Sequence, residues 1–141
     1  MSTPELIDEF QKTYQDGGFK LAVINIACPD MVAHTGKLKE TETAILAADT
    51  ALTELVKLAK ENNAYLFITA DHGNAEELLN LETGVVNTEH SSSPVPLIIF
   101  HNDDYHFKLS QGKLGDIAPT ILTLLDLEKP AAMTGNNLIV R

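Results

Sequence analysis

The chain has 141 residues, 44% of them hydrophobic and 21% charged, which is typical of a globular protein with a buried core. Twenty acidic residues against ten basic ones give a net charge of −10, which repels nucleic acids and anionic membrane surfaces and excludes both as expected partners. No apolar run approaches the roughly 20 residues of a membrane helix, and the single cysteine, Cys28, cannot form an internal disulfide, so we expect a cytoplasmic protein.

The first half of the chain predicts two helices separated by a strand. Residues 3–17 carry apolar side chains at helical spacing and finish with a pair of glycines, which can end a helix. Residues 20–27 are a continuous apolar run of the kind that is buried on both faces of a parallel sheet. Residues 39–61 place an apolar stripe opposite Lys and Glu side chains, which indicates a long amphipathic helix.

The second half predicts two more strands and a closing helix. Residues 65–69 have the pattern of a buried strand, so a strand, a helix and a strand follow one another and imply a right-handed parallel crossover. A hairpin-like loop, a third strand and a final helix follow over residues 83–87, 95–100 and 114–125. The predicted fold class is α/β, with a mostly parallel sheet.

Five side chains that can bind a metal ion lie in three short segments, each at a strand end or in a loop beside a strand. They are Asp30, His34, Asp71, His72 and His90. Ligands of open α/β sheets gather beyond the carboxyl ends of the strands, which is where Asp30 and Asp71 are predicted to lie. Because carboxylates and imidazoles are transition-metal ligands, the three segments together predict a metal centre.

Each segment also has an ordinary structural interpretation. Asp30 and His34, four residues apart, can be a solvated surface pair. Asp71, followed by acidic residues, also has the pattern of a helix N-cap. A lone loop histidine such as His90 is more often hydrogen-bonded than metal-bound, and Cys28 is more simply a small packed side chain than a soft ligand. The metal interpretation therefore depends on the three segments meeting at one sheet edge.

Residues 29–36, 69–77 and 88–96 closely resemble the C-terminal part of cofactor-independent phosphoglycerate mutases, and the resemblance covers nearly the whole chain. These metal enzymes of the alkaline phosphatase superfamily interconvert 3-phosphoglycerate and 2-phosphoglycerate in glycolysis. The resemblance implies an alkaline phosphatase-like fold in which residues 1–141 are the C-terminal segment of the metal-binding domain, a fragment of a three-layer α/β sandwich. The family's nucleophile segment and inserted substrate-binding domain have no counterpart in the chain.

The resemblance implies two ligand sets for two manganese ions. Asp30, His34 and His90 match the three residues that hold one ion. Asp71 and His72 match two ligands of the second ion, whose other ligands, an aspartate and the nucleophilic serine, belong to the segments without a counterpart. Two nitrogens and one carboxylate also suit zinc, cobalt or iron.

The implied mechanism is a phosphoserine relay, in which a metal-activated serine takes phosphate from one hydroxyl of the glycerate and returns it to the neighbouring one. Serines 91–93 have the composition of a loop, so no catalytic residue is identified in the chain, and the substrate-binding residues are unknown. A small phosphorylated substrate is expected only when the missing segments complete the site.

Two other functions stay open for the chain by itself. One is a stand-alone metal-dependent phosphohydrolase, in which activated water replaces the serine. The other is a non-enzymatic metal-binding or interaction module. The missing N-terminal strand should leave a sheet edge unpaired, which predicts self-association or a partner chain that covers the edge.

Overall fold

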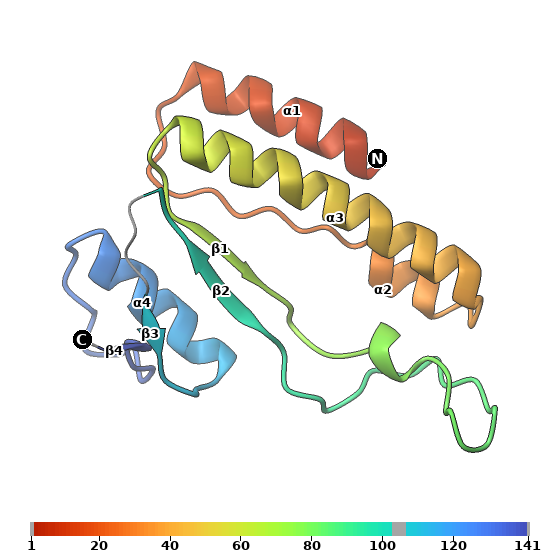
Figure 1. The fold of residues 1–141 in the computed structure, drawn as a ribbon. Coiled ribbons are helices and arrows are strands. Elements are labelled where there is room, and N and C mark those ends of the chain that lie inside the picture. The colour runs from red at the N-terminus through yellow and green to blue at the C-terminus, as the bar shows by residue number, and fades with distance from the viewer. Residues whose placement is uncertain (1, 103–106, 141) are drawn as a thin grey trace. The chain divides into compact units, whose positions relative to one another are not determined.

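The computed structural model describes residues 2–102 and 107–140, and the chain divides into two compact units, Met1–Asn102 and Asp103–Arg141 (Figure 1). The first unit contains three α-helices, two strands and a 3₁₀ turn: α1 (Thr3–Asp16), α2 (Cys28–Ala33), α3 (Leu38–Glu61), β1 (Leu66–Thr69), η1 (Ala75–Glu77) and β2 (Leu97–Phe100). The second contains two short strands, a 3₁₀ turn and a helix: β3 (Lys108–Leu109), η2 (Leu114–Asp116), α4 (Ile117–Leu124) and β4 (Ile139–Val140). None of the described helices combines the length and apolar character needed to cross a bilayer.

The core of the first unit lies between α1 and α3, which run side by side (Figure 1). Ile7 of α1 packs with Ala51 and Leu55 of α3, and all three side chains are buried. The helix α1 ends at Gly17, whose φ of 69° is a conformation that glycine adopts without a steric penalty. The helices predicted over residues 3–17 and 39–61 are therefore confirmed.

The apolar run at residues 20–27 is extended but forms no strand, and this prediction was wrong. The segment runs beneath α3 in Figure 1, and Ile24 and Ile26 pack against the Ile7–Ala51–Leu55 cluster. Leu21 is 54% exposed and Val23 is 88% exposed. Within residues 2–102 and 107–140 the run pairs with no strand. The helices therefore partly cover Ile24 and Ile26, whereas Leu21 and Val23, on the alternate positions, stay exposed.

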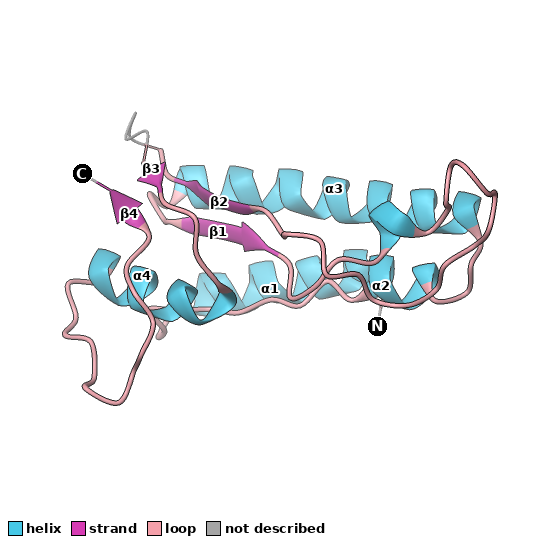
Figure 2. Cartoon of the chain, turned by 90° about the horizontal axis from the view of Figure 1, so that it is seen from below, coloured by secondary structure: helices cyan, strands magenta, loops and turns pink. Residues whose placement is uncertain are grey.

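The described strands form two separate antiparallel pairs. In the first unit β1 pairs with β2, with Leu66 opposite Phe100 and Thr69 opposite Leu97, and Figure 2 shows the two arrows lying together. In the second unit β3 pairs with β4. The predicted strands near residues 65–69 and 95–100 exist, but a mostly parallel sheet is not borne out. That prediction required residues 20–27 to pair with β1.

The loop between η1 and β2 begins with a hairpin, as predicted. An isolated antiparallel bridge joins Leu79 to Val86, and the Gly84 N–H donates to the Asn80 carbonyl at 2.8 Å. Gly84 has a φ of 70°, which the tight turn requires and glycine tolerates. The hairpin returns the chain toward α2 and leads into the segment that contains His90.

The second unit is organised around the buried carboxylate of Asp116. Its Oδ2 accepts a hydrogen bond from the Lys113 N–H and its Oδ1 accepts one from the Asn136 N–H, both at 2.8 Å. These two backbone donors, the Asn136 N–H foremost, lower the pKa of Asp116 below its ordinary value. Thr120 Oγ1 donates to the Asp116 carbonyl at 2.7 Å and accepts from the Leu138 N–H at 3.0 Å. The network joins the start of α4 to the segment before β4.

Candidate metal centre

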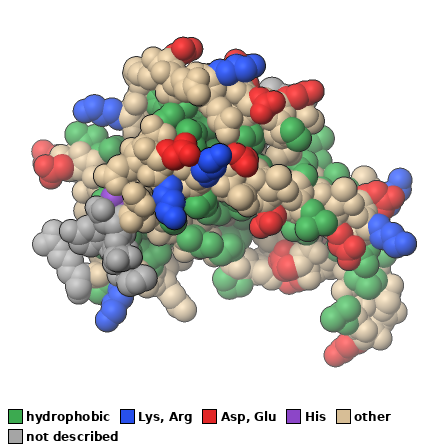
Figure 3. Space-filling model, turned by 45° about the horizontal axis from the view of Figure 1, so that its top comes forward, with side chains coloured by type: hydrophobic (Ala, Val, Ile, Leu, Met, Phe, Trp, Pro, Cys, Tyr) green, Lys and Arg blue, Asp and Glu red, His purple; other side chains and the backbone are tan. Residues whose placement is uncertain are grey.

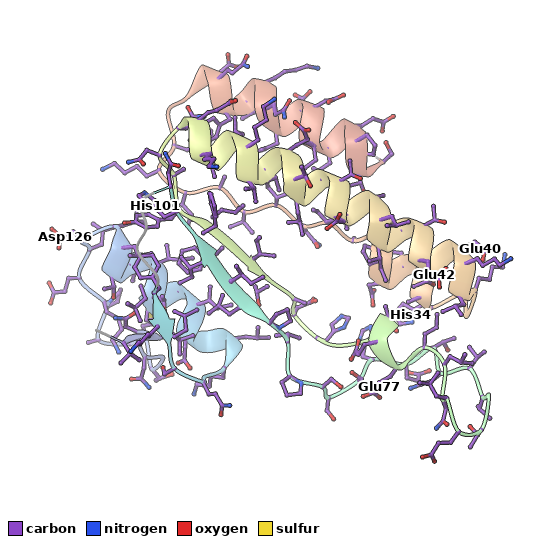
Figure 4. The ribbon with its side chains drawn as sticks, in the orientation of Figure 1. His34, Glu40, Glu42, Glu77, His101 and Asp126 are labelled. Carbon is purple, nitrogen blue, oxygen red and sulfur yellow. The ribbon has the colours of Figure 1, made fainter. Side chains whose placement is uncertain are left out.

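Three segments of the first unit meet beyond β1 and carry the predicted ligands. Asp30 lies in α2 and His34 directly follows it, whereas His90 lies in the loop before β2. Pro29 in the first turn of α2 favours a helix start, and the His34 N–H donates to the Asp30 carbonyl at 3.1 Å. This helical bond places the two side chains on one face, one turn apart. Figure 4 shows His34 and Glu77 on neighbouring segments of this region.

The structure brings Asp30, His34 and His90 into contact, and we call these three residues the ligand triangle. Asp30 Oδ1 lies 3.4 Å from Nε2 of His34 and 3.4 Å from Nε2 of His90, and the two Nε2 atoms are 3.0 Å apart. Ligand atoms about 2.1 Å from one ion are separated by about 3.4 Å in tetrahedral coordination and by about 3.0 Å in octahedral coordination. The ligand triangle therefore has the dimensions of a site for one transition-metal ion.

The hydrogen bonding of His34 also fits a metal ligand. Its Nδ1 lies 2.6 Å from the Thr88 carbonyl, and a carbonyl can only accept, so Nδ1 carries the hydrogen. The Nε2 atom of neutral His34 therefore presents a lone pair to His90 and Asp30. A lone pair this close to a carboxylate oxygen and a second imidazole nitrogen needs a shared proton or a cation between them. A metal ion satisfies all three atoms at once.

The ligand triangle is open to solvent and contains a negative charge, so a metal ion can reach it and is attracted to it. The side chains of Asp30, His34 and His90 are 38%, 42% and 49% exposed. A hydrogen bond from the Asn74 amide, assisted by the neighbouring histidines, holds the pKa of Asp30 below its ordinary value. Asp30 is therefore an ionised carboxylate at neutral pH, which is the form that binds a metal.

Asp71 and His72 lie next to the ligand triangle but are not part of it. His72 Nε2 is 3.6 Å from Asp71 Oδ1 and 3.9 Å from Asp30 Oδ1, and its ring stacks on the His90 ring with centroids 3.6 Å apart. The Asp71 side chain is 87% exposed. The alternative in which Asp71 caps a helix is not realised, because the chain forms only the short turn η1, which Asn74 precedes as its N-cap.

Cys28 lies outside the ligand triangle and packs between helices. Its Sγ is 3.0 Å from Thr3 Oγ1 of α1 and 3.6 Å from the Ala44 carbonyl of α3. The packing interpretation of this cysteine is therefore the one that the structure favours over a soft metal ligand.

Two side chains that the sequence did not single out surround the ligands. Asn74 donates to Asp30, and Glu76 accepts a hydrogen bond from Ser91, the neighbour of His90. The only sequence signal for them was their position directly after Asp71 and His72, which by itself is also typical of a helix start.

Comparison with known proteins agrees with the resemblance in the three segments. Residues 1–129 match the model of the Metalloenzyme superfamily. The whole chain is 44% identical to 2,3-bisphosphoglycerate-independent phosphoglycerate mutase 2 of Methanosarcina barkeri and 42% identical to the phosphoglycerate mutase of Acetivibrio thermocellus, and it spans 27% of the length of each.

A solved structure shows the same similarity. It is a phosphoglycerate mutase from Leishmania mexicana, crystallised at low cobalt concentration, which is 26% identical to this chain with a TM-score of 0.85, over 99% of this chain and 28% of that protein. The fold is thus shared with part of a phosphoglycerate mutase. The chain belongs to the Metalloenzyme superfamily, and over its whole length it is similar to phosphoglycerate mutases.

Proposed function

We propose that this chain is the metal-binding part of an alkaline phosphatase-like phosphoglycerate mutase, an isomerase that interconverts 3-phosphoglycerate and 2-phosphoglycerate in cytoplasmic glycolysis. The observation that carries the proposal is the ligand triangle, in which three donor atoms from two distant segments lie 3.0 to 3.4 Å apart. The names of the relatives that match the entire chain support it. Because the chain spans 27% of those relatives, the remaining machinery belongs to segments outside this match.

In this proposal Asp30, His34 and His90 hold one divalent ion, for which manganese is our first choice. Asp71 and His72 contribute to a second ion together with ligands from outside the chain. A bound divalent ion lowers the pKa of a nucleophilic hydroxyl and neutralises charge on the phosphoryl group. Asp30 contributes a negative charge, and the Thr88 carbonyl fixes the ring of His34 by accepting its Nδ1–H. The phosphoserine relay would use a serine outside the chain, so we expect the chain alone to be inactive.

We also propose that the uncovered extended segment at residues 20–27 associates with a second copy or with a partner chain. Its Val23 side chain is 88% exposed, and β1 pairs on one edge only within the described residues. Figure 3 shows apolar side chains among charged ones on the face in view. Pairing of the segment with another strand would satisfy its backbone and cover these side chains.

A chimeric enzyme tests the proposed activity. The 27% of the Methanosarcina barkeri mutase that matches this chain would be replaced by residues 1–141, and conversion of 3-phosphoglycerate to 2-phosphoglycerate would be assayed with Mn²⁺. We expect turnover by the chimera, loss of turnover in its Asp30→Ala variant, and no turnover by this chain alone. A folded chimera that binds Mn²⁺ but does not turn over substrate would contradict the proposal.

A phosphatase assay distinguishes the phosphohydrolase alternative from the mutase proposal. The isolated chain would be assayed with Mn²⁺ and p-nitrophenyl phosphate, beside its Asp30→Ala variant. Hydrolysis that disappears in the variant would favour a stand-alone hydrolase over a mutase segment. We expect no hydrolysis, because the sequence has a single arginine and scattered lysines, which offer no evident set of converging cations to hold the phosphate.

A further inference from the structure

A buried asparagine contacts the carboxylate at the centre of the ligand triangle. Asn74 is 5% exposed, and its Nδ2 donates to Asp30 Oδ1 at 2.6 Å across 44 residues of sequence. This oxygen is the same atom that faces the imidazoles of His34 and His90. Because Asn74 is buried, water has little access to replace the amide as a donor. The amide therefore restricts the orientation of the Asp30 carboxylate.

A second set of bonds holds the loop that contains His90. Ser91 Oγ donates to Glu76 Oε1 at 2.5 Å, and the Asn74 N–H donates to Glu76 Oε2 at 2.8 Å. The Ser91 N–H also donates to the Gly73 carbonyl at 2.7 Å. Glu76 thus joins Asn74 to the residue that follows His90. The hydrogen bonds that hold Asp30 and the loop of His90 are therefore linked through one carboxylate.

The same two side chains fill the space beside the Gly73 backbone. A Cβ at Gly73 would overlap the Glu76 carboxylate and the Ser91 hydroxyl. The hydrogen bond from Ser91 is also the main reason that the pKa of Glu76 lies below its ordinary value, so the acceptor stays charged at neutral pH. A charged acceptor makes a stronger bond to the hydroxyl than a neutral one.

We propose that Asn74 and Glu76 are positioning residues of the metal centre: Asn74 orients Asp30, and Glu76 fixes the loop of His90 through Ser91. Neither residue belongs to the ligand triangle. Outer hydrogen bonds of this kind set the direction of the ligand lone pairs, and their loss weakens metal binding without removing a ligand. The inference rests on the proposed function, since it assumes that the ligand triangle binds a metal.

Cobalt binding tests the inference on the full chain. Affinity would be measured by isothermal titration with Co²⁺, and the visible absorption of the Co²⁺-loaded chain would report ligand geometry. We expect Asn74→Ala to weaken binding about 10- to 100-fold and Glu76→Gln to weaken it about 10-fold, each with a changed absorption spectrum. The spectrum is a readout that a general loss of stability in the metal-free chain would not change.

Glu77→Gln is the matched control, because it removes the same charge one residue away. Glu77 accepts a hydrogen bond from Ser93 at 2.7 Å, and Gln can keep that bond. We expect its Co²⁺ affinity to stay within about twofold of the original. If Asn74→Ala does not fold, equal affinities of Glu76→Gln and Glu77→Gln overturn the inference. If the original chain itself binds no Co²⁺, the proposed function fails, whereas binding that is equal in all the folded variants overturns only the positioning roles.

Discussion

Asp30 lies at the centre of the candidate site. One of its oxygens accepts from Asn74 and faces His34 and His90. Asp30→Asn keeps the size of the side chain but removes the charge and one acceptor oxygen. We therefore expect Mn²⁺ affinity to fall by more than about 100-fold, beyond the loss typical of outer contacts. Isothermal titration with Mn²⁺ measures this.

Asp49→Asn is the control for this prediction, since it makes the same chemical change on the exposed face of α3. Its Mn²⁺ affinity should equal that of the original chain. An equal loss in both variants would mean that net charge, and not coordination by Asp30, governs binding.

The candidate ligands could be predicted from sequence, whereas their supports could not. Side chains such as Asp30 and His90 have a chemistry that limits what they can do. Asparagine and glutamate, as at Asn74 and Glu76, are common in turns, and their role depends on which side chain they contact in the folded protein. Asn74 meets Asp30 through folding of segments 44 residues apart, and no local pattern encodes that distance.

At the scale of elements, helix positions follow from local periodicity and strand pairing does not. The helix α3 was predicted within one residue at its start, because its apolar stripe repeats over 24 residues. The final helix begins as the 3₁₀ turn η2 and continues as α4 to Leu124, one residue before the predicted end. The antiparallel pairing of β1 with β2 is set by the path of the intervening loop, which residue periodicity does not describe.

The packing of α1 on α3 predicts a strong dependence of stability on Leu55. This side chain is 6% exposed in the cluster with Ile7, so Leu55→Ala leaves a cavity and should lower the free energy of unfolding by about 2 to 5 kcal/mol. Leu46→Ala, on the same helix but 66% exposed, should change it by less than about 0.5 kcal/mol. Urea denaturation of the metal-free chain measures both values. Similar losses in the two variants would contradict the position of the core.

The junction of η2 and α4 predicts a pH dependence that comes from Asp116. Its folded-state pKa lies below the ordinary value of 3.8, because the Asn136 and Lys113 N–H groups stabilise the ionised form. As the pH falls below about 4, the unfolded chain takes up this proton before the folded chain does, so stability decreases until the folded-state pKa is passed. The contribution is complete above the unfolded-state pKa.

Asp116→Asn tests this contribution. We expect a melting temperature several degrees lower at pH 7 and a shallower decline of stability with acid than in the original chain. Thermal melts at a series of pH values measure both. Asp126→Asn, an exposed change in the same unit, is the control and should leave the decline as steep as before. An unchanged acid profile in Asp116→Asn would show that other carboxylates account for it.

At the scale of the whole molecule, the extended segment at residues 20–27 predicts concentration-dependent association. Val23 is 88% exposed on a backbone that pairs with no described strand, and such a segment gains hydrogen bonds and apolar contacts by pairing with another chain. The net charge of −10 opposes the approach of two copies, so association should increase with salt, which screens the repulsion. Light scattering across a concentration series, at low and high salt, measures the mass.

Lysine substitutions locate the contact. Val23→Lys and Val85→Lys both change the net charge from −10 to −9, and both replace an exposed valine, but Val85 lies on the hairpin and is 62% exposed. If the extended segment forms the contact, Val23→Lys lowers the mass at high concentration despite the reduced repulsion between copies, whereas Val85→Lys does not lower it. A chain that stays monomeric at every concentration and salt would refute the association, and equal effects of the two substitutions would place the contact elsewhere.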